Sequence, residues 1–445
     1  MAVRTGGGTV LFTWRAVGFA AAVAVLFALS GLSQSLFWLA VEDDIALLLM
    51  LLVDYRLAGG PSGLAVARHV PASLSLGEDN VVRLTVRDLS GLPQTVAVKD
   101  DPPPDVPASR RELQFRLEPH QDAADTYVLH PLSRGEYRFG DLHVRRTGPL
   151  GLVARQWRVP AAERVKVLPN VAQAQRCQTL VMTGRLREAG VRISRQPGAG
   201  REFSSLREYL PDDEFRAIDW NATARRAKLI SRQYEMERSR EVVVALDAGR
   251  LMAGYVGELT KLDHAINAAL VLAYVSQAVG DRAGMMVFAE NVKTYVPPGK
   301  GSAHIHALLD AMYAVQPAPV DPSFLDAHLH LKARLRKRSL IVFFTDMDDP
   351  ESARSAVSHI SMLARKHLCI CVAVGDPQVV QAAEVVPATA EEAFRQSVAA
   401  IVLRDRELAL LQLRRAGVLV VDALPGAAAM EMVARYLELK QSGAF

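Results

Sequence analysis

Carboxylates that follow apolar runs are the residues of this chain best suited to hold a metal ion. Asp247 ends the run at 242–246, and Asp346 follows the run at 340–345. Ser302, in a glycine-rich turn, offers a hydroxyl. Oxygen ligands of this kind suit Mg²⁺. Because open α/β sheets bind ligands at the carboxyl ends of their strands, we expect these three side chains to gather at that edge.

The residues after Asp247 resemble the metal-ion-dependent adhesion site of von Willebrand factor A domains. That site reads Asp-x-Ser-x-Ser, and its carboxylate and hydroxyls hold Mg²⁺ while one coordination position stays open for a partner's carboxylate. Gly249 and Leu251 stand where the hydroxyls belong. We therefore expect Asp247, Ser302 and Asp346 to form a degenerate metal site that binds no cofactor.

Three interpretations of these carboxylates stay open. Asp247 and Asp346 could cap helices or accept hydrogen bonds from backbone amides. Alternatively, Arg250 could swing toward them and replace the cation with an internal ion pair. The third interpretation is a metal-dependent hydrolase that uses Asp247 and Asp346. The chain contains no Gly-x-Ser-x-Gly elbow, Walker lysine motif or His-Glu-x-x-His motif, so we expect no enzymatic activity.

Length, charge and cysteine content limit the classes of protein to which the chain can belong. Its 445 residues exceed one ordinary domain, and 52 basic residues nearly balance 48 acidic ones. A net charge of +4 gives no reason to expect nucleic-acid binding. Cys177, Cys369 and Cys371 form neither a disulfide framework nor a zinc spacing, so we expect buried thiols in a reducing compartment.

Two apolar stretches lie near the N-terminus. Residues 16–32 are about as long as a bilayer is thick, and residues 36–53 carry an acidic triplet at 42–44. Basic residues flank the pair of stretches, which places both ends in the cytoplasm by the positive-inside rule. We expect residues 1–57 to be a transmembrane hairpin of one or two helices. This hairpin would anchor the chain in the bacterial inner membrane, with its soluble domains facing the cytoplasm.

The remaining chain changes its periodicity twice. Residues 58–170 show short alternating runs between glycine and proline turns, which predicts an antiparallel β-sandwich. Residues 171–240 are a charged connecting segment. Residues 241–445 alternate strand-like and helix-like segments, which predicts a doubly wound α/β domain. The expected fold class is therefore α/β, a von Willebrand A-like, Rossmann-like domain preceded by the β-sandwich and the transmembrane hairpin.

The connecting segment carries a long motif, which we call the signature segment (residues 192–241). It contains Glu-Phe at 202–203, Leu-Arg-Glu-Tyr at 206–209, Pro-x-Asp at 211–213 and Ile-Asp-Trp at 218–220. These residues resemble the hallmark of a bacterial family, domain of unknown function fifty-eight. The resemblance extends over nearly the whole chain and includes the turn at 148–152, where Gly148 replaces the family's usual acid.

The charged side chains of the signature segment have two interpretations. They could form a face that docks a partner, or they could pair internally and clamp the segment onto the α/β domain, with Trp220 as an apolar peg. The candidate partner-binding residues are Arg201, Glu202, Arg207, Glu208, Tyr209, Asp213, Arg216, Asp219, Trp220, Arg225 and, beside Asp247, Arg250.

The family resemblance implies a function in recognition. Such proteins look like membrane-attached partners of MoxR-type AAA+ ATPases that help to assemble or activate other complexes. We therefore expect a non-enzymatic, membrane-anchored adaptor that binds a MoxR-like ATPase and client proteins, including other membrane proteins.

Overall fold

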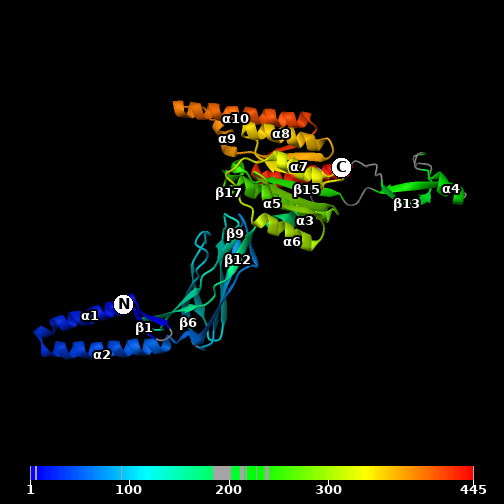
Figure 1. Ribbon diagram of the computed structural model, residues 1–445. Coiled ribbons are helices and arrows are strands. Elements are labelled where there is room, and N and C mark those ends of the chain that lie inside the picture. The colour runs from blue at the N-terminus through cyan, green and yellow to red at the C-terminus, as the bar shows by residue number, and fades with distance from the viewer. Residues whose placement is uncertain are drawn as a thin grey trace. The chain divides into compact units, whose positions relative to one another are not determined.

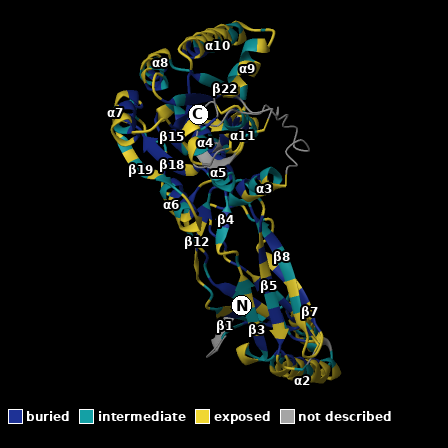
Figure 2. Ribbon diagram, turned by 90° about the vertical axis from the view of Figure 1, so that its right-hand side faces the viewer, coloured by how far each residue is buried: buried dark blue, intermediate teal, exposed yellow. Residues whose placement is uncertain are grey.

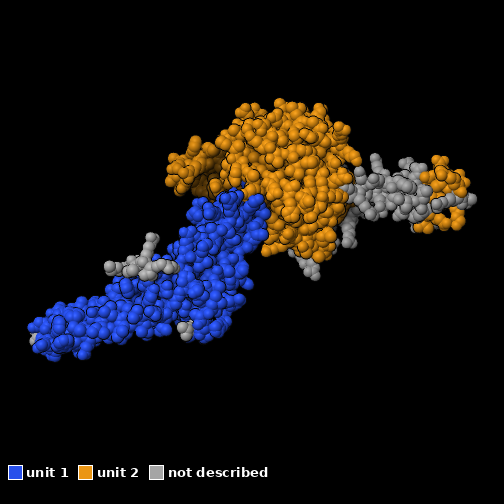
Figure 3. All heavy atoms as spheres, turned by 60° about the horizontal axis from the view of Figure 1, so that its bottom comes forward, with its two compact units in different colours: residues 1–168 blue, residues 169–445 orange. Residues whose placement is uncertain are grey.

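The chain divides into two compact units, residues 1–168 and residues 169–445, in the computed structural model (Figures 1 and 3). The structure describes residues 2–5, 8–91, 93–183, 202–210, 215, 218–226, 228–235 and 240–443. Each unit has its own buried core, so each is described by itself.

The first unit consists mainly of antiparallel strands, as expected for residues 58–170. In β5, alternate residues such as Val82, Leu84 and Val86 are fully buried, because successive side chains of a strand point to opposite faces. One sheet has the order β1 (Ala2–Thr5), β2 (Gly8–Phe12), β11 (Val153–Val159), β10 (Leu142–Thr147), β6 (Gln94–Lys99) and β7 (Glu112–Leu117). A second sheet has the order β3 (Leu64–His69), β5 (Asn80–Asp88) and β8 (Asp122–Leu129). A third has the order β4 (Ser73–Ser75), β12 (Arg164–Leu168) and β9 (Gly135–Arg138).

The transmembrane hairpin predicted for residues 1–57 is wrong. Strands β1 and β2 lie within this range, followed by helices α1 (Trp14–Leu29) and α2 (Gln34–Leu57). Among the described residues, no helix combines the length and the apolar character that a membrane span requires. The 16 residues of α1 extend over about 24 Å, less than the roughly 30 Å of a hydrocarbon core. Helix α2 is longer, but it carries acidic residues at 42–44 and at Asp54.

Asp54 fastens α2 to the turn at 148–152. Its Oδ1 accepts a hydrogen bond from the Leu150 amide at 2.8 Å, and its Oδ2 accepts from the amides of Leu152 and Val153 at 2.8 and 2.7 Å. A side chain at Gly148 would collide with this carboxylate. The carboxylate of this turn is therefore supplied by helix α2.

The second unit contains a six-stranded sheet in which only β19 runs antiparallel to its neighbour. Every residue of β20 is buried, because helices cover both faces of the sheet (Figure 2). The strand order is β19 (Val292–Gly299), β18 (Arg282–Phe288), β15 (Glu241–Asp247), β20 (Leu340–Thr345), β21 (Leu368–Val374) and β22 (Leu419–Ala423). This is the mostly parallel sheet that the alternating pattern predicted.

The helices divide between two cores, one on each face of that sheet. The first core joins Val242 and Val244 of β15 to helices α3 (Val171–Met182), α5 (Lys261–Ala278), α6 (Ser302–Tyr313) and α11 (Pro425–Gln441). The second joins Val243 and Ala245 to helices α7 (Phe324–Arg334), α8 (Pro350–Ala364) and α10 (Ala390–Arg415). Helix α9 (Pro377–Glu384) packs on α10. All three cysteines are buried and free.

Part of the signature segment forms a small substructure. Strand β13 (Glu202–Glu208) pairs antiparallel with β14 (Ile230–Glu235), and helix α4 (Trp220–Arg226) lies between them in sequence. Asp219 begins the helix, since its Oδ1 accepts a hydrogen bond from the Ala222 amide at 3.0 Å.

Candidate functional site

The candidate site lies where the strand order of the six-stranded sheet reverses. From β15 the chain moves to β18 on one side, and β20 returns on the other side. The crevice at such a switch point, outside the carboxyl ends of the strands, is where open α/β sheets bind ligands. Asp247 ends β15 and Asp346 follows β20, so the structure places these two carboxylates at the same edge of the sheet.

Asp247 is buried and satisfied by the protein's own donors. Its Oδ2 accepts a hydrogen bond from the Thr345 hydroxyl at 2.6 Å, and its Oδ1 accepts from the Gly249 amide at 2.7 Å. Burial, opposed by these two hydrogen bonds, raises the pKa of Asp247 to about 7. The carboxyl group is thus already engaged on both oxygens.

Asp346 is paired with a lysine that the sequence analysis did not single out. The Nζ of Lys261 lies 2.6 Å from Asp346 Oδ2 and 3.2 Å from Asp348 Oδ2. The side chains of Lys261 and Asp346 are only 6% and 1% exposed. A cation that belongs to the chain therefore lies between the carboxylates of the β20–α8 loop.

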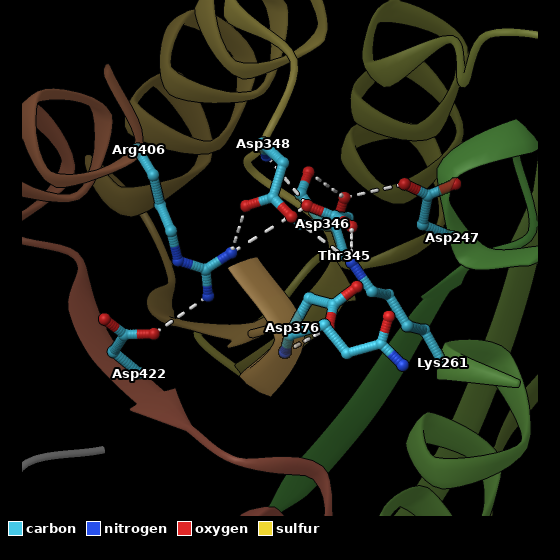
Figure 4. A network of polar contacts seen from close by, with 9 residues as sticks. Asp247, Lys261, Thr345, Asp346, Asp348, Asp376, Arg406 and Asp422 are labelled. Carbon is cyan, nitrogen blue, oxygen red and sulfur yellow. Dashed lines mark hydrogen bonds and ion pairs between the residues drawn. The ribbon is translucent and has the colours of Figure 1, made fainter. Parts of the chain in front are cut away.

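A second cation extends this arrangement across the edge of the sheet. Arg406 of α10 donates to Asp348 Oδ1 at 2.8 Å and, through its other terminal nitrogen, to Asp422 Oδ1 at 2.8 Å. Asp422 belongs to β22. The side chains alternate in charge in the order Asp346, Lys261, Asp348, Arg406 and Asp422, and we call them the ion-pair chain (Figure 4).

The electrostatics of the ion-pair chain follow from burial and from the number of cationic partners. Burial raises the pKa of Asp346 to about 6, and the neighbouring charge of Asp348 adds to the rise. Burial also acts on Asp348, but Arg406 and Lys261 together outweigh it, so the pKa of Asp348 is lowered. Burial opposes the charge of Lys261, yet Asp346 and Asp348 raise its pKa. Asp348, which lies 2.8 Å from Arg406 where Asp346 lies 3.8 Å from it, is therefore the stronger acid of the two.

The expectation that Ser302 joins this edge is wrong. Because β19 runs antiparallel, its last residue, Gly299, lies opposite Ala283 at the start of β18. Asp247 lies opposite Phe288, at the other end of the same strand. The length of β18 separates the two edges by about 20 Å. Ser302 follows β19 and is exposed at the amino end of the sheet.

A serine at position 249 would not fit the surrounding structure. A Cβ at this position would lie 2.8 Å from Pro322 Cδ and 3.0 Å from Asp247 Oδ1. Leu251, at the second hydroxyl position, belongs to the short helix η5 (Arg250–Ala253). The backbone that follows Asp247 is therefore packed too tightly at position 249 for a metal-binding hydroxyl.

Arg250 does not take the place of the cation. Its Nε donates to Asp321 Oδ1 at 2.5 Å, and a terminal nitrogen lies 3.5 Å from Asp349 Oδ1. The side chain is 46% exposed. The internal ion pair that was one of the three interpretations is made by Lys261 and not by Arg250.

These side chains do not fit a magnesium ion. The oxygens of Asp247 and Asp346 accept from Thr345 and Lys261, and Ser302 lies at the other edge. Within the described ranges, no three His, Cys, Asp or Glu side chains are grouped so that they could hold a metal. What the arrangement offers is a fixed set of charges at the strand ends.

The sequence contained a pattern from which part of the ion-pair chain could have been predicted. Lys261 is the first residue of α5 and lies within the capping box that Thr260 and Asp263 form. A lysine there opposes the helix dipole, which indicates a compensating acidic partner. Asp422 follows an apolar run, as Asp247 does. Arg406 gave no such signal, because it is one of several charged residues on a long helix.

The structure describes the predicted signature residues only in part. Arg201, Asp213 and Arg216 lie outside the described residues, and Glu202 and Arg207 are described only as backbone of β13.

The other signature residues lie at or near the surface of their substructure. Glu208 accepts from Lys228 at 2.9 Å, and both side chains are exposed. Tyr209 is half-buried and donates its amide to Leu229, and Arg225 is exposed on α4. Trp220 is 57% exposed, and its ring centroid lies 5.8 Å from that of Phe215.

Comparison with known proteins finds a family match over part of the chain. The model described as "Protein of unknown function DUF58" matches residues 205–406. An uncharacterized protein of Mycobacterium tuberculosis, Rv1480, is 27% identical over 223 residues, which cover 49% of this chain and 69% of that protein. The uncharacterized protein YeaD of Bacillus subtilis is 28% identical over 124 residues, 27% of this chain and 30% of that protein.

Solved structures show only weak similarity. The CARDB domain of PF1109 from Pyrococcus furiosus covers 24% of this chain and 87% of its own, at 15% identity and a TM-score of 0.17. Proximal thread matrix protein 1 of the mussel byssus covers 46% of each chain, at 11% identity and a TM-score of 0.26. At these TM-scores the similarity assigns neither fold nor function. The sequence match is confined to one region: residues 205–406 of this chain match the model of the DUF58 domain, whose function is unknown.

Proposed function

We propose that this chain is a non-catalytic recognition protein that binds protein partners through two surfaces, the carboxyl edge of the sheet in its α/β unit and the signature segment. The observation that carries the proposal is the position of Lys261, which lies between Asp346 and Asp348 where a metal-dependent adhesion site would hold its ion. A built-in cation keeps the charges of the edge fixed without a metal. The edge thus retains the location of a von Willebrand A-like recognition surface while its own residues supply the charge.

The partner that we propose is a MoxR-type AAA+ ATPase, with client proteins as further ligands. This part of the proposal rests on the family resemblance, to which the DUF58 match lends support. The exposed pair Phe215 and Trp220 supports it independently. Aromatic side chains are enriched at the centres of protein interfaces, and two exposed rings in contact offer such a centre.

Capture of partners by the full-length chain tests the proposal. A tagged chain, purified from the cells that produce it, should retain a AAA+ ATPase that mass spectrometry identifies. The double variant Phe215→Ser and Trp220→Ser should reduce that recovery about tenfold or more, because it removes both rings.

A matched control distinguishes specific recognition from non-specific binding by exposed aromatic side chains. Tyr255, which is 65% exposed elsewhere in the second unit, is replaced by serine. This variant should recover as much ATPase as the unchanged chain. Absence of any AAA+ protein from the unchanged chain would contradict the proposed partner, and equal losses in both variants would contradict the role of the aromatic pair.

A further inference from the structure

A pocket of about 420 Å³ opens at the carboxyl edge of the sheet, beside the ion-pair chain. Its walls come from the loops after β20, β21 and β22 and from helices α9 and α10. The volume falls within the range of small-ligand sites, and this edge is where open α/β sheets bind ligands. Both observations indicate a binding site.

Carboxylates outnumber free cations in this pocket. Its charged lining residues are Asp348, Asp376, Glu407 and Asp422 against Arg406 and Arg414. Arg406 is 6% exposed and already donates to two of these carboxylates. The Glu407 carboxylate makes no hydrogen bond or ion pair with any other described residue, and Asp422 is 46% exposed. The pocket therefore presents unused negative charge.

Apolar side chains form the rest of the lining. Val379 and Val380 come from α9, Leu403 from α10, and Leu424 follows β22. Lysine and arginine bury their methylene stems on apolar surface of this kind while their charged heads reach polar groups. A small metal ion or a bulky apolar ligand would leave either the walls or the carboxylates unused.

We propose that this pocket binds the side chain of a lysine or arginine that a partner protein presents. The stem would lie against Val379, Val380 and Leu403, and the head would reach Glu407 and Asp422. The inference rests on the proposed recognition function and specifies the chemistry of the contact. It also reverses the polarity of a metal-dependent adhesion site, which takes a carboxylate from its partner.

Peptide titration of the full chain tests this proposal directly. The probe is a blocked pentapeptide with lysine between two pairs of glycines, and its control carries norleucine, which has a similar stem but no charge. Binding is followed by the methyl NMR signals of Val379, Val380 and Leu403. The lysine peptide should bind at least about tenfold more tightly than the norleucine peptide, because hydrogen bonds to charged groups are strong.

Charge variants of the pocket have opposite expected effects. Glu407→Gln should weaken lysine-peptide binding about three- to tenfold, whereas Arg414→Gln should tighten it, because the first removes an attractive charge and the second a repulsive one. Glu391→Gln, on the same helix and in an exposed pair with Arg395, should leave binding unchanged. Spermidine, a free polyamine with the same chemistry, should bind no more tightly than the peptide.

Several outcomes would overturn the proposal. They are equal binding of the two peptides, weaker binding after Arg414→Gln, a tighter complex with spermidine, or no saturation below about 10 mM peptide. Each leaves the partner capture by Phe215 and Trp220 unaffected. Failure of the peptide test with an intact capture would reject this pocket alone, whereas failure of the capture with peptide still bound would reject the proposed ATPase partner alone.

Discussion

Two buried carboxylates, one in each unit, are stabilised in different ways. Asp54 of the first unit accepts hydrogen bonds from three backbone amides of one turn. Asp346 of the second unit accepts from one backbone amide, that of Asp348, and its other oxygen is held by Lys261, a side chain from a helix distant in sequence. Backbone donors are part of the fold, whereas a side-chain cation can be removed by one substitution. The comparison suggests that Asp54 serves local architecture and that the ion-pair chain is the part of the molecule where charge can be varied.

Removal of the lysine should have the largest effect on stability. Lys261→Met removes the closer of two cations from the buried Asp346 carboxylate, the other being Arg406 at 3.8 Å, so we expect a loss of about 3–5 kcal/mol in the free energy of unfolding. Urea denaturation of the full chain measures it. Lys293→Met, in an exposed pair with Glu290, should leave the stability unchanged. A loss below about 1 kcal/mol for Lys261→Met would show that the network does not depend on its cation.

Removal of the first-unit carboxylate should have a smaller and more local effect. Asp54→Ala deprives three amides of their acceptor, which we expect to cost about 2–3 kcal/mol. Hydrogen exchange at the amides of Leu150, Leu152 and Val153 should accelerate. The double variant Asp54→Ala and Gly148→Asp places the acid within the turn and should slow exchange again. Exchange that stays at the original rate in Asp54→Ala would contradict the role of this carboxylate.

The pH dependence of stability should report the titration of Asp247 together with that of Asp346, whose pKa is also raised. The folded pKa of Asp247, about 7, lies above the unfolded value of about 3.9, so the folded state holds this proton more tightly. The stabilising contribution is therefore complete below about pH 4 and is lost as the pH rises toward 7, with a slope of at most about 1.4 kcal/mol per pH unit. Asp247→Asn should flatten the profile in this window. An unchanged profile would show that Asp247 does not titrate there.

Metal addition should have the smallest effect. Millimolar Mg²⁺ should shift the melting temperature of the unchanged chain by less than about 1 °C, because Asp247 and Asp346 already have donors. Gly249→Ser should not create a metal site, since its Cβ would press against Pro322. Calorimetric titration with Mg²⁺ and Mn²⁺ checks both statements. Binding that Asp247→Asn abolishes would restore the metal-dependent interpretation and, with it, the hydrolase alternative.

The sequence predicted the parallel sheet and the pairing of two strand-end acids because apolar runs followed by aspartate are local patterns. Asp247 and Asp346 are such cases. It misplaced Ser302 because the direction of β19 depends on a hairpin with β18, which periodicity does not reveal. It offered Arg250 as one possible internal cation because Arg250 is close to Asp247 in sequence. It did not single out Lys261, which reaches the site only once α5 packs on the sheet.

Helices α1 and α2, near the N-terminus, show a second limit of prediction from sequence. Hydropathy alone predicted a membrane hairpin, but it did not consider strands β1 and β2 or the buried role of Asp54. The acidic triplet at 42–44 was interpreted as a marker of the membrane interface, and Asp54 was not considered. In the structure Asp54 is a hydrogen-bond acceptor for a turn about a hundred residues away in sequence. Such long-range partners cannot be read from a window of neighbouring residues.

The Lys261 ammonium has a consequence for regulation. A bound metal ion can be loaded, exchanged or stripped by chelators, so a metal-dependent adhesion site responds to the supply of cations. An ammonium that is part of the polypeptide cannot dissociate, and it is in place as soon as the domain has folded. Changes in magnesium concentration would then not alter the charge of this surface. The fraction of the surface that is bound would depend on the concentration of the partner alone.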